Sequence, residues 1–232
     1  MPSILPSTMS RESNLQCDGY FVLRNAAPCD PRLLARLRRR GGSAGAIFNH
    51  SAATKSRNDF KRRQMQTTLR DNEVPGLLHL VSKYGNGSLP VKWSALFSFA
   101  GCQAQAPHAD WTPCPNEAQG ADALGCIVAL ENGTRFDVWP GSHRYVRMDG
   151  QTVSTMAQVA DAPQPIRRKR LRLRAGDVLF FRSDLVHAGA SYSVPNIRLH
   201  CYLDAPHIPR APNRTWLVHR HAHEALRALI LA

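Results

Sequence analysis

The second half of the chain reads as a series of short apolar segments separated by glycine, proline and asparagine. From Val91 onward, the candidate strands are residues 93–100, 125–130, 134–138, 171–174, 177–181 and 197–203. Residues 18–23, where a turn signal precedes apolar residues, predict one earlier strand. Many short strands with frequent turns are typical of an antiparallel barrel or a jelly roll, so the sequence predicts a mainly β fold.

Helices are expected on the outside of this fold. Pro31 stands where a helix would begin, Leu33 and Leu37 give that helix an apolar side, and Gly41 follows its end. Residues 75–83 and 219–231 are two further helical candidates, whereas the polar residues 43–73 give no clear pattern. No repeat or linker stands out, so we expect residues 1–232 to form a single domain in which residues 1–14 are flexible.

Composition narrows the class of protein. The chain has 232 residues, of which 43% are hydrophobic, and this is enough to bury a core. No apolar run approaches the roughly 18 residues of a membrane helix, and the first residues lack a secretory signal pattern. None of the six cysteines is spaced as C-x-x-C, so we expect free thiols in a reducing, intracellular compartment, either cytoplasm or nucleus.

A possible metal site lies at His108-Ala109-Asp110. Side chains two residues apart on a strand share a face, so His108 and Asp110 could present a nitrogen and an oxygen to one ion. His187, directly after an apolar strand, is the best candidate for a third ligand. Two histidines and one carboxylate leave coordination positions open, which suits Fe(II) and oxygen chemistry. Each motif is weak alone, because H-x-D occurs often by chance and a single histidine is more often structural.

A possible anion-binding arginine lies on the last candidate strand. Alternate residues of this strand divide into two sets, Ile197, Leu199, Cys201 and Leu203 on one face and Arg198, His200 and Tyr202 on the other. An arginine inside a barrel is costly unless an anion meets it, and a guanidinium matches a carboxylate in a two-pronged pair. A dicarboxylate cosubstrate would supply that anion. From this strand alone, an Arg198 that faces solvent at a sheet edge is equally possible.

Together these motifs resemble the Fe(II)- and 2-oxoglutarate-dependent dioxygenase superfamily, most closely its phytanoyl-CoA dioxygenase-like branch. The matching residues are His108-x-Asp110, His187 and Arg198, in the right order. Residues 139–143, Trp-Pro-Gly-Ser-His, resemble the P-G-S-H segment of that branch, and Asn196 and Arg198 resemble its N-x-R ending. The resemblance covers roughly residues 15–205.

The resemblance implies a double-stranded β-helix, a jelly-roll or cupin-like core with packed helices. It implies that His108, Asp110 and His187 bind iron as the catalytic residues, and that Arg198 binds the distal carboxylate of 2-oxoglutarate. Some members carry a serine two residues after the arginine, where this chain has His200. Tyr202, or a hydroxyl such as that of Ser94 or Ser98, could complete the contact instead. Gln105 could touch the cosubstrate or orient a ligand.

The implied activity is hydroxylation, or oxidative demethylation, coupled to the conversion of 2-oxoglutarate to succinate and CO2. Fe(II), 2-oxoglutarate and O2 would be required, with ascorbate as a possible reductant. Trp139, Ser142 and His143 could line the substrate pocket, since the P-G-S-H segment lies near the metal in the family resembled. Their alternative role is a tight turn between strands.

Charge suggests an anionic substrate. Thirty Lys and Arg against seventeen Asp and Glu give a net charge of +13. Sixteen of the basic residues fall in three clusters, namely Arg32, Arg36, Arg38, Arg39 and Arg40; Lys55, Arg57, Lys61, Arg62 and Arg63; and Arg167, Arg168, Lys169, Arg170, Arg172 and Arg174. Nucleic acid is therefore one candidate substrate, although such clusters can also be solvated faces. The alternatives are a small-molecule or acyl-CoA hydroxylase, a non-catalytic nucleic-acid-binding protein on this fold, and a cupin-like metal enzyme that is not an oxygenase.

Overall fold

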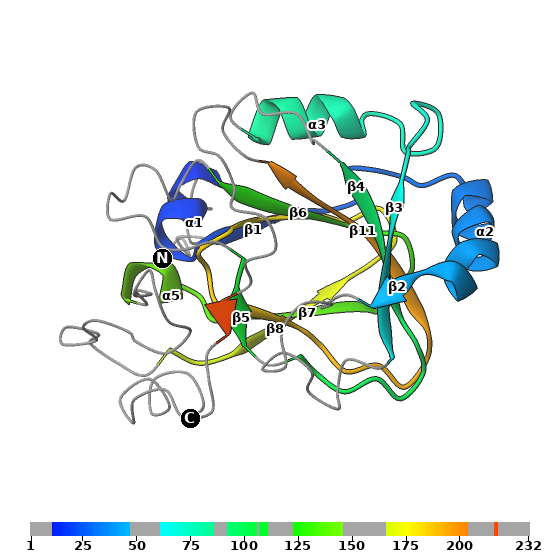
Figure 1. The fold of residues 1–232 in the computed structure, drawn as a ribbon. Helices are drawn as coiled ribbons and strands as arrows, with labels where there is room; N and C mark the ends of the chain where they lie inside the picture. Colours follow the sequence, from blue (N-terminus) through cyan, green and yellow to red (C-terminus); the bar gives the residue numbers. More distant parts are fainter. Residues whose placement is uncertain are drawn as a thin grey trace, which may run out of the picture.

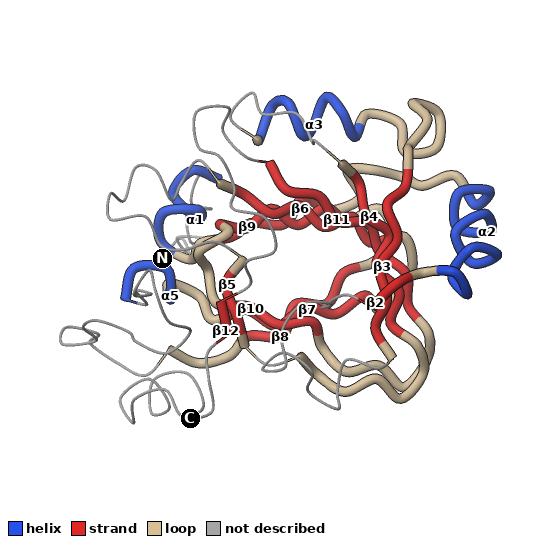
Figure 2. Tube along the Cα trace, in the orientation of Figure 1, coloured by secondary structure: helices blue, strands red, loops and turns tan. Residues whose placement is uncertain are grey.

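In a computed structural model, two antiparallel β-sheets face each other, and helices cover the outside of the larger one (Figures 1 and 2). The structure describes residues 11–46, 61–85, 92–105, 107–110, 123–145, 166–203 and 216–217. All neighbouring strands in the two sheets pair in antiparallel fashion. The prediction of a mainly β protein with a double-stranded β-helix core is confirmed.

The larger sheet has seven strands and the smaller sheet has five. In spatial order, the larger sheet consists of β1 (Tyr20–Leu23), β9 (Val178–Arg182), β6 (Leu124–Ala129), β11 (Asn196–Leu203), β4 (Trp93–Ser98), β3 (Arg62–Thr67) and β2 (Gly45–Ala46). The smaller sheet consists of β12 (Trp216–Leu217), β5 (His108–Ala109), β10 (His187–Gly189), β7 (Thr134–Val138) and β8 (Lys169–Leu173). The helices are α1 (Arg11–Cys17), α2 (Pro31–Arg40), α3 (Leu77–Tyr84) and α5 (Ser142–Tyr145), with a 3-10 turn at Gly41–Ser43.

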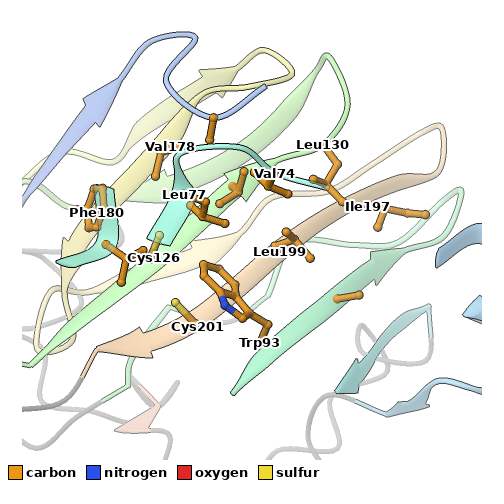
Figure 3. Packing of buried hydrophobic residues seen from close by; sticks show 14 of the residues in the cluster. Val74, Leu77, Trp93, Cys126, Leu130, Val178, Phe180, Ile197, Leu199 and Cys201 are labelled. Atoms are coloured by element: carbon orange, nitrogen blue, oxygen red, sulfur yellow. The ribbon is translucent and has the colours of Figure 1, made fainter. Parts of the chain in front are cut away.

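One hydrophobic core lies between the larger sheet and the helices α2 and α3. The apolar face of β11 contributes Leu199 and Cys201, and α3 contributes Leu77, as Figure 3 shows. The buried side chains of Leu33 and Leu37 come from α2. This helix begins with Pro31 at its first turn, where the Asp30 side chain accepts a hydrogen bond from Arg32 N at 2.8 Å. The four apolar residues of β11, Ile197, Leu199, Cys201 and Leu203, all belong to this core, which confirms the alternation predicted for the last strand.

A second core fills the space between the two sheets. The larger sheet contributes Ile127, Leu179 and Phe181, and the smaller sheet contributes Phe136 and Leu173, among other residues of the cluster. These side chains fill part of the barrel interior. The polar face of β11 points into the same interior. The apolar side chains of this core therefore lie beside the buried polar side chains of β11.

The predicted strands are all present, and their ends differ from the predicted ones by at most two residues. The polar segment that gave no pattern contains β2 and β3. Residues 11–14 of the segment expected to be flexible lie in α1, whereas residues 1–10 and the expected helix 219–231 lie outside the described residues. Within the described ranges, no helix is long and apolar enough to cross a membrane, and all five cysteines that they contain are free thiols.

Candidate metal centre

Two strands of the smaller sheet bring the three predicted metal ligands together. In the pairing of β5 with β10, His108 lies directly opposite His187. Asp110 follows β5, where its backbone N–H donates to Ser183 O at 2.8 Å. The side chains of His108, Asp110 and His187 are all buried. The sequence analysis predicted that His108 and Asp110 share one face of a strand. In the structure β5 ends at Ala109, before Asp110, but the chain after it still directs the carboxylate toward the histidines.

The three side chains form a compact donor set. Their potential ligand atoms lie within 4.8 Å of one another. Asp110 Oδ2 is 3.4 Å from His187 Nε2, and Asp110 Oδ1 is 3.9 Å from His108 Nε2. The two imidazole rings are 4.4 Å apart between centroids. Two nitrogens and a carboxylate at this spacing could hold one divalent ion and leave other positions open, as in Fe(II) oxygenases.

The orientation of His187 is fixed by its surroundings. Its Nδ1 lies 2.9 Å from the carbonyl oxygen of Leu185, which leaves Nε2 to face Asp110. The rings of Phe136 and Phe181 pack against the imidazole at centroid distances of 5.1 and 4.8 Å. Phe181 reaches this position only because residue 125 is glycine, since a Cβ there would collide with its ring. Apolar packing therefore holds the imidazole in place.

The electrostatics of the site favour a charged carboxylate. Burial alone would raise the pKa of Asp110. Its coulombic interaction and hydrogen bond with His187, with a further coulombic contribution from His108, outweigh burial and hold the pKa of Asp110 below its usual range. Asp110 is therefore available as an anionic ligand across the neutral pH range.

Arg198 lies inside the barrel. Its strand, β11, is central, because it pairs with β4 on one side and β6 on the other. The arginine is 2% exposed, so the alternative of a solvent-facing arginine at a sheet edge is wrong. Its Nη1 donates to Ser98 Oγ at 3.0 Å, while its buried Nε has no hydrogen-bond partner among the described residues. A buried cation with an unused donor suits an anionic ligand.

A second interior arginine, Arg62, was missed by the sequence analysis. It is fully buried on β3 and donates to Ser98 Oγ at 3.2 Å, to Gln103 O at 2.8 Å and to Gly189 O at 3.1 Å, as well as to Ala190 O. These bonds join the larger sheet to the end of β10. Apolar and polar residues do not alternate in its strand. The sequence analysis therefore assigned Arg62 to a basic cluster, and such clusters are usually on the surface.

Gln105 acts on the strand that carries His187. Its side-chain Oε1 accepts a hydrogen bond from Gly189 N at 2.8 Å, and its backbone N donates to Gly189 O at 2.9 Å. Gln105 thus fixes the end of β10, and a contact with the cosubstrate stays a prediction. Tyr202 is partly buried with its ring 4.5 Å from that of His200, and its cofactor role stays a prediction as well.

The three residues predicted to contact substrate are buried in the framework beside the site. Trp139 N donates to Val186 O at 3.0 Å, and Ser142 Oγ accepts from Val186 N at 2.9 Å. Both bonds hold the residue that precedes His187. His143 Nε2 lies 3.0 Å from Gln16 O, at the end of the barrel near α1. These contacts show that the three residues support the framework around the site, and their contact with substrate stays a prediction.

Comparison with known proteins agrees with this geometry. The family model described as phytanoyl-CoA dioxygenase (PhyH) matches residues 15–198. No curated protein sequence gives a significant match.

Solved structures share the fold. The non-heme alpha-ketoglutarate-dependent epimerase SnoN from nogalamycin biosynthesis aligns over 84% of this chain and 82% of its own, with a TM-score of 0.60 and 23% identity. HygX from Streptomyces hygroscopicus, with nickel and 2-oxoglutarate bound, aligns over 88% and 90%, with a TM-score of 0.55 and 12% identity. The carbocyclase SnoK aligns over 85% of both chains, with a TM-score of 0.52 and 21% identity.

Proposed function

The chain belongs to the phytanoyl-CoA dioxygenase family and is an iron- and 2-oxoglutarate-dependent oxidoreductase, and we propose that it oxidises a C–H bond of a small molecule. The observation that carries the proposal is the buried set of His108, Asp110 and His187. In this reading the oxidation is a hydroxylation or an oxidative demethylation, coupled to the decarboxylation of 2-oxoglutarate to succinate and CO2.

Each interior residue has a distinct task in this proposal. His108, Asp110 and His187 would hold the iron, and Arg198 would bind the distal carboxylate of 2-oxoglutarate with donors that include its unused Nε. The bound iron and cosubstrate supply the activation of O2 for attack on a C–H bond. The rings of Phe136 and Phe181 keep water from His187, and Gln105 and Ser142 fix the two ends of the segment that carries it. The chain thus contributes position and a dry environment rather than proton transfer.

The similar structures support a small molecule as substrate. SnoN has been solved with Fe3+, alpha-ketoglutarate and nogalamycin RO, and HygX with nickel, 2-oxoglutarate and hygromycin B. Both ligands are small molecules held by chains of the same fold. By analogy of fold, the same class of substrate is proposed for this chain.

The contacts of the basic clusters favour this proposal over nucleic acid. Arg36 pairs with Glu73 at 2.8 Å, Arg170 with Asp137 at 2.7 Å, and Arg38 with Glu131. Arg62 is inside the barrel. Charges neutralised or buried in this way release few counterions from a phosphate backbone, so they add little affinity for nucleic acid. Lys55 and Arg57 lie outside the described residues.

The test is succinate formation by purified protein with Fe(II), 2-oxoglutarate, ascorbate and O2. The reaction is run alone and with a small-molecule library, acyl-CoA esters, DNA or RNA, and His108→Ala serves as the inactive control. The proposal predicts stimulation by a member of the library and none by nucleic acid. If DNA or RNA stimulated succinate formation and no small molecule did, the proposed substrate class would be wrong. Full turnover by His108→Ala would overturn the assignment of the site.

A further inference from the structure

We propose that a cavity beside α3, separate from the metal centre, binds a small organic anion with an apolar body. The cavity has a volume of about 760 Å³ and lies between α3, the turn that precedes it and the neighbouring ends of β3 and β4. None of the three candidate metal ligands lines it, and neither does Arg198. A volume of this size is within the range of small-molecule sites.

The floor and one wall of the cavity are apolar. Val74, Leu77 and Trp93 are buried side chains of the outer core (Figure 3), and all three line the cavity. Leu78, which also lines it, is 50% exposed and is one of two large hydrophobic residues so exposed in the described ranges. Small-molecule sites are lined mainly by apolar side chains with a few polar groups. A flat apolar ring or chain would cover Leu78.

Thr67 lines the cavity beside the apolar residues. Thr67 is 8% exposed, and its Oγ1 has no hydrogen-bond partner among the described residues. Thr67 lies opposite Trp93 in the pairing of β3 with β4, at the end of the sheet that α3 covers. The hydroxyl oxygen is shielded from solvent, so Thr67 contributes its other atoms to the cavity wall.

The charges at the rim favour an anion. Arg70 and Lys92 line the cavity, and within the described ranges neither forms an ion pair. Asp71 is the one carboxylate among the lining residues, and it offsets part of this charge. His79 adds a further positive charge when it is protonated. The two basic side chains outnumber the single carboxylate, so the rim of the cavity attracts an anion. The contribution of each charged side chain can be measured by neutralising it.

The test uses 8-anilinonaphthalene-1-sulfonate, an aromatic anion whose fluorescence rises in an apolar site, with the full iron-free chain. We expect saturable binding of one probe per chain. Arg70→Gln should weaken binding about fivefold and Asp71→Asn should strengthen it by a similar factor, because each change alters one charge near the ligand. Leu78→Ser should also weaken binding. All three residues are exposed, so the variants are expected to fold.

Two controls locate the probe. Arg39→Gln, at an exposed position of α2, should leave the affinity unchanged. His187→Ala should also leave it unchanged, because the proposed site lies outside the metal centre. Unchanged affinity in both charge variants, or a loss of binding in His187→Ala, would overturn the proposal. This outcome is independent of whether the protein oxidises a small molecule, since the probe assay requires neither iron nor turnover.

Discussion

Arg62 and Arg198 donate to the same hydroxyl oxygen, Ser98 Oγ, at 3.2 and 3.0 Å, from two strands that flank the strand of the serine. The two buried cations therefore lie close together inside the barrel. Arg62 also donates from Nη2 to the backbone carbonyls of Gln103 and Gly189, whereas Arg198 has one hydrogen bond among the described residues, to Ser98. We infer that Arg62 holds the frame, and that Arg198, beside a second positive charge, binds the anion.

The first prediction concerns Arg198. Arg198→Met should weaken 2-oxoglutarate binding about tenfold to a hundredfold, because it removes charge-assisted hydrogen bonds to a carboxylate. Iron affinity should stay the same, since Arg198 is not one of the clustered ligand residues. Calorimetric titration of the anaerobic iron-loaded protein measures both quantities. The matched control is Arg172→Met, at an exposed position of β8. Equal 2-oxoglutarate affinity in the two variants would remove Arg198 from the cofactor site.

Arg62 carries the second prediction, which is one of stability. Arg62→Met should lower the free energy of unfolding by about 3–5 kcal/mol, because it leaves buried backbone carbonyls without donors. Those carbonyls belong to Gln103 and Ala190, whereas Gly189 O loses its bond from Arg62 but keeps the one from Gln105 N. Urea unfolding of the metal-free protein gives the value. A loss smaller than about 1 kcal/mol, the typical net worth of one hydrogen bond, would show that Arg62 is not a clamp between the sheets.

The third prediction links Ser142 to the metal. Ser142→Ala removes the acceptor for the buried Val186 N–H, which directly precedes His187. We expect a loss of about 1–3 kcal/mol in stability. Iron affinity should fall about tenfold, as is typical when the support of a ligand is lost. Ser193→Ala, at an exposed position, is the control and should change neither value. Unchanged iron affinity in Ser142→Ala would leave the serine with a purely structural role.

The three candidate metal ligands could be proposed from the sequence because two of them lie close together in it and the third follows an apolar strand. His108 and Asp110 are two residues apart, and the strand that carries Arg198 alternates cleanly, so its two faces could be separated, although the strand alone did not show which face is the inner one. The alternation works because one face of β11 packs on helices and the other lines the barrel.

Arg62 could not be found in the same way. In β3 only the first and last residues are buried, so its sequence, RRQMQT, has no apolar period. The buried arginine then looks like its exposed neighbour Arg63. Similarly, the ion pairs that join Arg36 to Glu73 and Arg170 to Asp137 connect residues more than thirty positions apart. Only tertiary structure reveals that these basic clusters are partly neutralised.

The fourth prediction is a dependence of stability on pH that arises from His143. Burial, with a smaller contribution from Arg182, lowers the pKa of His143 from 6.5 to about 4, although Asp184 opposes the shift. Between these two values the unfolded chain binds a proton that the folded protein does not. Stability should therefore fall as pH decreases from 6.5 to about 4, by about 3 kcal/mol from this group, and should not depend on it at higher pH.

Urea unfolding at pH 7 and pH 4.5 measures this contribution. The difference in unfolding free energy between the two pH values should be smaller in His143→Asn than in the parent protein. The exposed His79 provides the matched variant, and His79→Asn should keep the parent's difference. Identical pH dependence in the parent and His143→Asn would mean that the histidine is not held neutral in the folded state.

In the proposed metal centre, His108, Asp110 and His187 hold one iron to which 2-oxoglutarate binds. The most direct measurement is the visible charge-transfer absorbance that appears when Fe(II) is titrated anaerobically into the protein with 2-oxoglutarate present. We predict a band that saturates at one iron per chain, requires both components and is lost in Asp110→Ala. A protein that binds iron without the band, or an Asp110→Ala variant that retains it at full strength, would contradict the account.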